Sequence, residues 1–424
     1  MSKTKKVKAR TTCRISGEKF VPLFSLGKLY LSDFIEHRET PAYEPVELAL
    51  SLAPKSGLVQ LQHTVPGDVM YRKYWYKSGT NATMTNELMG IAKKAQEVMH
   101  LKEGDVFLDI GCNDGTLFRF VEKHIIRIGF DPNDFKAESI QHADIIINNY
   151  FDAKEYQKTK HGHKKAKIIT SIAMFYDLEH PDSFVEDIRK TLDRDGLWII
   201  QMSYLPLMLK QLAFDNICHE HLEYYNLESL QYLLNKHSLD IVDCELNDIN
   251  GGSFRIYIRH KNASPATFAT APYRDVARMR VDSILEYEKS LRLRKKKIYM
   301  DFWKEINLLK KQTMDFIKKE KRKGKTIWGY GASTKGNTLL QWFGLDHTLI
   351  DAIAERSEAK FGLKTAGTNI PIKSEADMRK AKPDYLLVLP WHFIDEFKKR
   401  ETDFLRRGGK FIVPCPRFEI ISTS

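Results

Sequence analysis

Two segments of this chain share one local pattern, a buried strand followed by a glycine-containing turn and then an amphipathic stretch. The first is VFLDIGCNDGTLFRF, over residues 106–120, and the second is TIWGYGASTKGNTLL, over residues 326–340. Turns of this kind join a parallel strand to the helix that follows it, and doubly wound α/β folds bind their ligands there. The chain therefore carries two such units, and its 424 residues suffice for two or three domains.

Strands and helices alternate after both turns. Behind the first turn, buried strands are predicted at RIGFDP, ADIIINN, KIITSIAM and LWIIQMS, with helices between them (the first of these at TLFRFVEKH). Such alternation predicts a parallel sheet covered by helices. We therefore expect one α/β domain over residues 69–272 and a second over residues 323–424. The highly charged segment 273–322 contains no glycine or proline and is expected to be a helical connector.

The composition is that of an ordinary globular protein, with 42% hydrophobic and 29% charged residues. No apolar run approaches the length of about 18 residues that a membrane span needs, and the basic start lacks a signal sequence. The five cysteines are scattered and suggest no disulfide framework, so a cytoplasmic protein is expected.

The formal net charge is +12. Much of it lies in runs within or beside the helical segment, where charges usually face solvent. No zinc finger, RNP-type strand or basic–aromatic pattern accompanies these runs, which argues against nucleic acid as a partner. An anionic small substrate, such as a nucleotide-linked sugar, would use the same positive bias.

The first glycine turn has the features of a nucleoside-cofactor site. Asp109 ends its strand and could accept hydrogen bonds from the amino-acid part of a cofactor, while Gly111 can adopt positive φ and admit a ligand close to the backbone. Asn113 follows in the same turn. Asp131 ends the next strand, where an acidic side chain binds ribose hydroxyls in nucleotide-binding α/β folds.

The same turn disfavours a dinucleotide. It lacks GxGxxG, and its carboxylates at Asp109 and Asp114 would repel a pyrophosphate. S-adenosylmethionine has a sulfonium cation and no phosphate, so it is the predicted cofactor. The alternative is that Gly111 and Gly115 serve only tight turns.

Segments spread along the whole chain resemble a known family. They are, in order, YWYKSGTNATM, LDIGCNDGTL, FDNICHEHLEYYNLESL, NGGSFRIYIRH, GYGASTKGNTLL, KPDYLLVLPWHF and GGKFIVPCP. In these segments the chain is similar to the sugar C-methyltransferases, which act on nucleotide-linked deoxy-keto sugars. The resemblance implies a small N-terminal zinc module, a central Rossmann-like class I methyltransferase domain and a C-terminal Rossmann-like domain, with the sugar nucleotide bound between them.

Methylation at carbon requires a base that removes a proton next to a ketone, and histidine suits this at neutral pH. The HEH motif at residues 219–221 precedes a helix that Asn226 is expected to cap. The resemblance implies that Glu220 and His221 are catalytic, with His221 as the base, and places Tyr76 in the same site. Without the resemblance, a polar surface cluster explains the HEH residues equally well, and simple aromatic packing, the commoner role of such residues, explains Tyr76.

Two positions depart from the family pattern. Cys218 stands where the family often has tyrosine, and Tyr176 lies near the place of an active-site histidine. Both are expected to contact the substrate. Methylation of a sugar oxygen is the nearest alternative activity, and a non-catalytic sugar-nucleotide binding protein is another, against which the intact cofactor turn argues.

Residues 1–68 are strand-like, at KFVPLFSLGKLYL, EPVELALSLAP and SGLVQLQHTV, and predict a small β-rich module. The resemblance implies zinc here, held by two CxxC pairs. The corresponding residues are Cys13 with Ser16 and Ala53 with Ser56. One thiol, two hydroxyls and a methyl group cannot form a structural zinc site, so zinc is not expected.

The second turn carries Gly329, Gly331 and Gly336, and Glu355 ends the following strand. Ser333 and Lys335 at the helix start favour a phosphate group. We interpret this turn as part of the sugar-nucleotide pocket, with Gly331, Lys335 and His392 as substrate-binding residues. A domain that keeps this fold for structure alone is the alternative.

Overall fold

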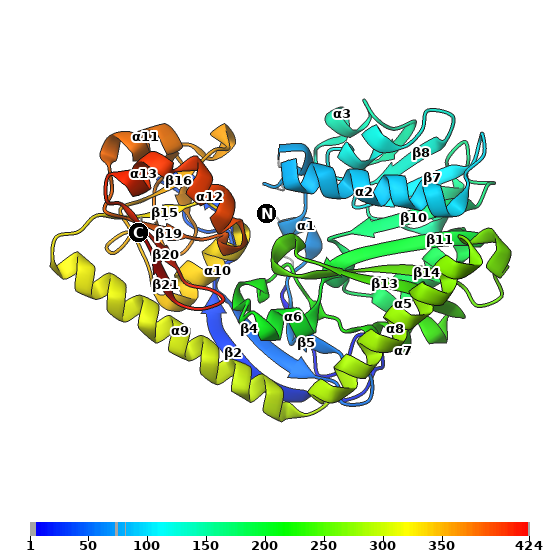
Figure 1. Ribbon diagram of the computed structural model, residues 1–424, viewed down its shortest axis with the longest axis horizontal. Helices are drawn as coiled ribbons and strands as arrows, with labels where there is room; N and C mark the ends of the chain where they lie inside the picture. Colours follow the sequence, from blue (N-terminus) through cyan, green and yellow to red (C-terminus); the bar gives the residue numbers. More distant parts are fainter. Residues whose placement is uncertain (1–5, 73–74, 81, 423–424) are drawn as a thin grey trace.

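The computed structural model describes residues 6–72, 75–80 and 82–422. Two α/β lobes stand side by side above a small β-rich module, and two long helices run along the base (Figure 1). Among the described residues, no helix has both the length and the apolar character needed to cross a membrane.

The central lobe contains a seven-stranded sheet in the order β13-β14-β11-β10-β7-β8-β9. Its parallel strands are β7 (Val106–Ile110), β8 (Ile126–Phe130), β9 (Ile145–Ile147), β10 (Ala166–Ile172) and β11 (Leu192–Ser203). Strand β14 (Ser253–His260) runs antiparallel to both β11 and β13 (Leu239–Asn247). The sheet is covered by helices that include α2 (Ala82–Met99), α5 (Pro181–Thr191) and α7 (Leu227–Lys236), the last capped by Asn226 as expected.

One helix expected in this lobe is much shorter than the sequence suggests. The segment TLFRFVEKH forms a single 3₁₀ turn, η2 (Thr116–Phe120), after which Val121 returns to extended geometry. Leu117 and Phe118 are fully buried beneath α2, whose Leu88 and Ile91 face the same core. Because α2 already covers this face of the sheet, no space remains for a second long helix.

The C-terminal lobe contains a six-stranded sheet in the order β18-β16-β15-β19-β20-β21. Its parallel strands are β15 (Ile327–Tyr330), β16 (Ala352–Glu355), β18 (Ile372–Ser374), β19 (Tyr385–Val388) and β20 (Lys410–Val413), and β21 (Glu419–Ile421) is antiparallel. Helices α10 (Thr334–Phe343), α11 (Glu375–Ala381), α12 (Ile394–Arg400) and α13 (Thr402–Arg406) complete it. The predicted class, two Rossmann-like units with a β-rich module, is confirmed.

The N-terminal module contacts both lobes. Its sheet has the order β12-β5-β4-β2, from β2 (Val21–Leu29), β4 (Val46–Leu52) and β5 (Val59–Leu61) together with β12 (Glu223–Tyr224) of the central lobe. A shorter pairing joins β3 (Phe34–Ile35) to β17 (Lys364–Thr365) of the C-terminal lobe. Strand β12 follows the HEH motif directly, so the module fixes the position of that loop.

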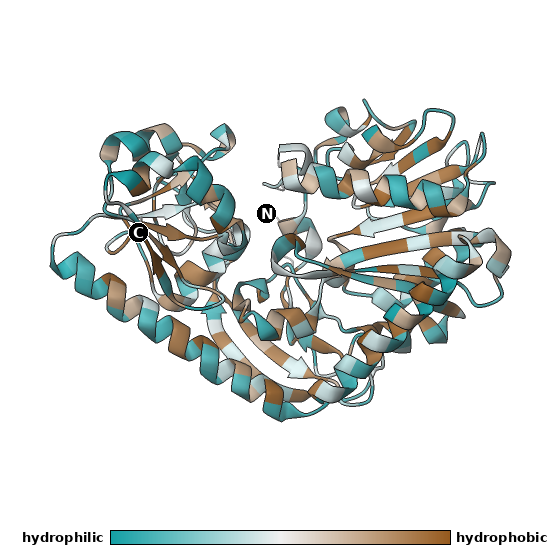
Figure 2. Cartoon of the chain, in the orientation of Figure 1, coloured by the Kyte–Doolittle hydropathy of each residue, from teal (hydrophilic) through white to brown (hydrophobic). Residues whose placement is uncertain are grey.

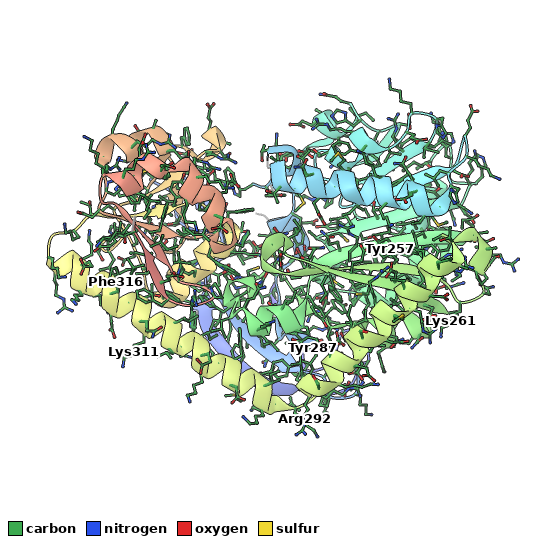
Figure 3. The ribbon with its side chains drawn as sticks, viewed as in Figure 1. Tyr257, Lys261, Tyr287, Arg292, Lys311 and Phe316 are labelled. Carbon is green, nitrogen blue, oxygen red and sulfur yellow. The ribbon has the colours of Figure 1, made fainter. Side chains whose placement is uncertain are left out.

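The charged segment between the lobes forms α8 (Ala271–Leu291) and α9 (Lys296–Arg322), separated where Arg292 adopts a left-handed conformation. Helix α9 shows hydrophilic and hydrophobic bands along its length (Figure 2), and the apolar side chains that it buries include Tyr299, Phe302 and Ile306. Lys311 lies on the outer side of α9, whereas Phe316 contacts Tyr385 of the C-terminal lobe with ring centroids 5.4 Å apart (Figure 3). Near the end of α8, the buried Glu288 accepts hydrogen bonds from Tyr204 and from the backbone N–H of Leu227. The helices are therefore packed parts of the fold as well as links between lobes.

Candidate active site

One cavity of about 670 Å³ lies between the lobes. Its walls come from the first glycine turn, the loop after β10, the HEH loop, the turn before β14 and the start of α10 in the C-terminal lobe. The predicted site residues that line it are Tyr76, Asp109, Gly111, Asn113, Asp131, Tyr176, His221, Lys335 and His392. Cys218, Glu220 and Gly331 lie outside this lining. The size is that of a typical ligand pocket.

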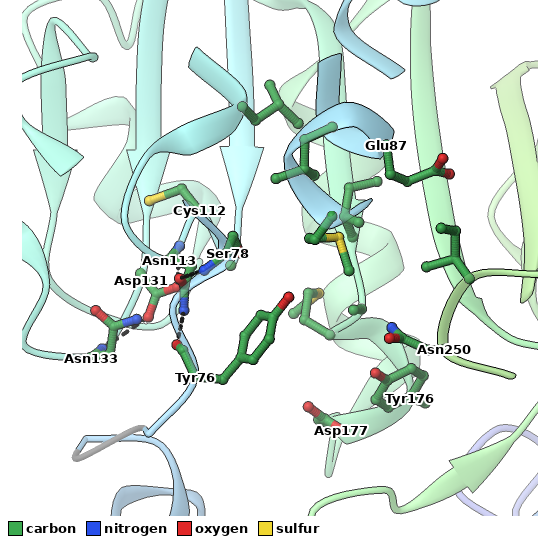
Figure 4. Close-up of a pocket in the computed structure, with 18 of the residues that line it drawn as sticks. Tyr76, Ser78, Glu87, Cys112, Asn113, Asp131, Asn133, Tyr176, Asp177 and Asn250 are labelled. Carbon is green, nitrogen blue, oxygen red and sulfur yellow. Dashed lines mark hydrogen bonds between the residues drawn. The ribbon is translucent and has the colours of Figure 1, made fainter. Parts of the chain in front are cut away.

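Two carboxyl groups define the cofactor end. Asp109, at the carboxyl end of β7, is buried and accepts a hydrogen bond of 2.6 Å from the Thr170 hydroxyl. Burial raises the pKa of Asp109 to about 7. Asp131, after β8, accepts backbone N–H groups from Asn113 at 2.8 Å and Asn133 at 2.9 Å, one on each oxygen (Figure 4). These bonds hold the Asp131 carboxylate at the cavity wall. Its oxygens can still accept hydrogen bonds from the two hydroxyl groups of a ribose.

Gly111 lies between these acids with φ of 78°, and a Cβ atom there would come within 2.9 Å of the Met174 side chain. A side chain at this position would therefore meet steric conflict and strain. The cavity fits the nucleoside and amino-acid parts of S-adenosylmethionine, because the turn at Gly111 leaves room for a ligand between the Asp109 and Asp131 carboxyl groups.

The segment carrying Tyr76 is tied to the cofactor turn. The Asn113 side chain accepts a hydrogen bond from the Ser78 backbone and donates one to the Tyr76 carbonyl, both at 3.0 Å (Figure 4). Gly79 N–H donates to Asp114 at 2.8 Å. The Tyr76 ring consequently enters the cavity, and burial raises its pKa, which keeps the phenol protonated. The Asn113 side chain, predicted to bind cofactor, holds this segment in place.

The three residues of the HEH motif lie in three different environments. The His219 ring donates through Nε2 to the Val46 carbonyl in β4, at 3.0 Å. Glu220 is buried, with its carbonyl accepting a hydrogen bond from the Tyr71 hydroxyl at 2.8 Å. His221 alone of the three faces the cavity.

The hydrogen bond of His221 determines its tautomer. Its Nδ1 lies 2.9 Å from the Asn216 carbonyl oxygen, which can only accept a hydrogen bond. The proton therefore lies on Nδ1, and Nε2 carries the lone pair of a base. Burial, with the nearby Lys335 charge, lowers the pKa of His221 to about 3, so the ring is neutral at physiological pH.

Tyr176 packs against this base, with ring centroids 4.3 Å apart. Cys218 is buried behind the cavity wall, and burial raises the pKa of its thiol. Asp177, which the sequence analysis did not identify, lines the cavity beside Tyr176 (Figure 4). Its Oδ1 has no hydrogen-bond partner within the described part of the chain, and burial raises its pKa well above the usual range.

The C-terminal lobe contributes Lys335 and His392 to the cavity. Ser333 also lines the cavity, and its hydroxyl caps α10 by accepting the Gly336 N–H at 3.0 Å. At Gly331, a Cβ atom would lie 2.8 Å from the Pro390 ring, so this glycine permits close packing of the turn against the neighbouring strand end. Glu355 accepts the Ala332 N–H at 2.8 Å.

The two turns where the family's zinc pairs would lie have matching backbone geometry. Gly17 N–H donates to the Cys13 carbonyl at 3.0 Å, and Gly57 N–H donates to the Ala53 carbonyl at 2.8 Å. The Cys13 thiol and the Ser56 hydroxyl are hydrogen-bonded at 3.5 Å. The Glu18 carboxylate accepts the Ser16 hydroxyl and the backbone N–H of Ser56. These residues do not fit structural zinc, which prefers thiolate and imidazole ligands.

The sheet order, with one antiparallel strand beside β11, and acids at two adjacent strand ends define a class I methyltransferase domain. Residues 83–243 match the family model described as a methyltransferase domain, and residues 248–416 match that described as a C-methyltransferase C-terminal domain. The protein is an S-adenosylmethionine-dependent methyltransferase.

Its family is shown by a relative of similar length. The chain is 30% identical over 376 residues to C-methyltransferase NovU of Streptomyces niveus, covering 86% of this chain and 85% of the relative. The chain belongs to this C-methyltransferase family, which confirms the resemblance found in the sequence.

Solved structures give weaker likenesses. Magnesium protoporphyrin IX methyltransferase from Synechocystis, with bound SAH, has a TM-score of 0.34 at 11% identity and covers 42% of this chain and 88% of its own. An S-adenosylmethionine-dependent methyltransferase from Clostridium acetobutylicum has a TM-score of 0.33 at 13% identity, covering 42% and 92%.

Several cavity residues follow from no motif. Asn250 bonds to Lys335 through its backbone carbonyl, and the Asn216 bond to His221 likewise uses a backbone carbonyl, which any residue supplies, so no sequence signal marks these two contacts. Asp177 could have been found, because it directly follows Tyr176 in the loop after a predicted strand of the central sheet.

Proposed function

We propose that this enzyme methylates a carbon atom of a nucleotide-linked keto sugar, next to the ketone. The observation that carries the proposal is the tautomer of His221, whose Nδ1–H is held by the Asn216 carbonyl while the ring lines the cofactor cavity. A neutral imidazole with a free lone pair is one of the groups that can remove a proton from carbon.

The chemistry follows from this base. Nε2 of His221 takes the proton from the carbon next to the ketone, and the electron pair of the broken C–H bond delocalises onto the ketone oxygen as an enolate. S-adenosylmethionine supplies an electrophilic methyl group when bound. The enolate carbon forms the new carbon–carbon bond to the methyl carbon as the sulfur–methyl bond breaks, with its electron pair staying on sulfur so that S-adenosylhomocysteine is the leaving group. The ketone is restored, and the abstracted proton leaves from the imidazole to solvent.

Other residues support the reaction. The Tyr76 phenol, protonated and tied to the cofactor turn, is a hydrogen-bond donor between the two ends of the cavity. Glu220 lies outside the lining, and the bond that its backbone carbonyl accepts from Tyr71 positions the loop without using the Glu220 side chain. We place the nucleotide part of the acceptor toward the C-terminal lobe, where His392 and the start of α10 line the cavity.

The activity can be tested with purified protein. A panel of thymidine-, uridine-, guanosine- and cytidine-diphosphate-linked keto sugars is incubated with S-adenosylmethionine, and products are analysed by mass spectrometry and NMR. A gain of one methyl group with a C–CH₃ resonance is expected. An O–CH₃ resonance would instead establish the oxygen methyltransferase, and methyl transfer to none of these sugars would refute the acceptor class.

A further inference from the structure

Lys335 occupies an unusual position for a lysine. It lies in the first turn of α10 in the C-terminal lobe, yet its ammonium group reaches the central lobe. There Nζ donates to Oδ1 of Asn216 at 2.6 Å and to the Asn250 carbonyl at 3.3 Å. The side chain also lines the cavity.

This ammonium has no counter-ion in the described residues. No carboxylate among them forms an ion pair with it, and both hydrogen-bond acceptors are neutral oxygens. Asp215 is the carboxylate whose charge acts on Lys335, from beyond ion-pair distance; its Oδ2 accepts the Trp391 indole N–H at 3.1 Å, and its Oδ1 has no hydrogen-bond partner among the described residues. Lys335 is half-buried at the cavity wall, and its ammonium has three N–H donors, of which two are used. The third donor is available to an anion in the cavity.

Lys335 is linked to the base through one residue. The side-chain oxygen of Asn216 accepts a hydrogen bond from the Lys335 ammonium, and its backbone carbonyl accepts one from the His221 ring. The Lys335 charge contributes, after burial, to the low pKa of both His221 and His392. The ammonium is thus one residue away from the proton-abstracting group, and its charge adds to the burial that lowers the pKa of that group.

We propose that Lys335 donates a hydrogen bond to the ketone oxygen of the acceptor and stabilises the enolate that forms when His221 removes the proton. The inference rests on the proposed function and assigns Lys335 a catalytic role where the sequence analysis assigned a phosphate contact. The ketone oxygen is bonded to the carbon adjacent to the one that loses its proton, so its donor must lie beside the base. Lys335 keeps its proton throughout, while the C–H electron pair becomes the enolate charge.

A role in enolate stabilisation and a role in phosphate binding predict different effects of Lys335→Met on the exchange rate and on nucleotide affinity. An enolate donor predicts that deuterium exchange at the acceptor carbon, measured in D₂O at saturating sugar nucleotide without methyl donor, slows about 10²–10³-fold, as for other oxyanion donors. The affinity for the free nucleoside diphosphate, measured by calorimetry, should change less than about twofold. Removing the charge also makes His221 more basic, so a slower rate cannot arise from a weaker base.

Controls separate the outcomes. Lys360→Met removes another largely buried lysine of the same lobe, one that donates to the Ala332 carbonyl and lies outside the cavity lining, and should exchange at the wild-type rate. Lys335→Cys, measured before and after alkylation to aminoethylcysteine, compares the same folded protein without and with the ammonium, and alkylation should restore exchange. The comparison of Lys335→Cys before and after alkylation still tests the enolate role if Lys335→Met does not fold.

Three results would overturn the inference. Wild-type exchange in Lys335→Met with a nucleoside diphosphate affinity reduced more than about tenfold would make Lys335 a phosphate ligand. Wild-type exchange with unchanged affinity would leave it a contact between lobes only. Alkylation that restores affinity but not exchange would exclude the enolate role. Absence of exchange in the wild-type enzyme would instead refute the proposed function itself.

Discussion

At the scale of single residues, the site depends on backbone groups that hold reactive side chains in one state. The Asn216 carbonyl fixes the proton of His221, and the N–H groups of Asn113 and Asn133 fix the Asp131 carboxylate. The residue types could be predicted from motifs and family resemblance. Their protonation and hydrogen-bonding states could not be predicted. Every residue has a backbone carbonyl, and the sequence does not mark the one, five positions before His221, that holds its proton.

Asp131 gives the first prediction. Asp131→Ala should weaken S-adenosylmethionine binding by about 1.5–3 kcal/mol, because a hydrogen bond to a charged group is lost. Asp134→Ala, in the same turn but exposed, is the matched control and should bind normally. Calorimetry on both variants checks this, and equal affinities would remove Asp131 from the ribose site.

Asp109 predicts a pH dependence of cofactor binding. Its pKa is raised to about 7 in the ligand-free protein, so below pH 7 the carboxyl is neutral. A cationic amino group binds the ionised form better, and the dissociation constant should therefore rise below pH 7 by up to about tenfold per unit and level off above it. Thr170→Val removes a hydrogen bond that lowers this pKa, so the onset should move to higher pH. A dissociation constant unchanged from pH 8 to 5.5 would contradict the assignment.

At the scale of elements, most strands were predicted because each is a short apolar run between turn residues, and the cap at Asn226 was predicted from its position. The helix expected after Gly115 was wrong, since the local pattern cannot reveal that α2 already covers that face. The pairing of β12 with β5 was likewise hidden, because it joins residues distant in the sequence.

The N-terminal module yields a prediction at this scale. Zinc should be well below one atom per chain by elemental analysis, and a chelator should leave Tm unchanged, because Glu18 links the two turns by hydrogen bonds. Glu18→Ala should lower the free energy of unfolding by about 1–3 kcal/mol, while Glu44→Ala, exposed in the same module, should not. Stoichiometric zinc, or equal stability of the two variants, would contradict this account.

At the scale of the whole molecule, the cavity exists because three parts of the chain meet. Phe214 packs between Trp342 and Phe343 of the C-terminal lobe, and the next two residues bond to Trp391 and Lys335. The domains could be predicted from two repeated patterns, whereas their contact could not, because it rests on irregular loops. The segment of Phe214, Asp215 and Asn216, which contacts the C-terminal lobe, also holds the base His221.

The central claim is that His221 removes the proton from the acceptor carbon. Deuterium uptake at that carbon in D₂O, without methyl donor, measures this step alone. His221→Asn should slow uptake about 10²–10⁴-fold with cofactor affinity unchanged, because asparagine cannot serve as a base. His219→Asn, outside the cavity, should retain uptake. Uptake at the wild-type rate in His221→Asn would show that another group is the base.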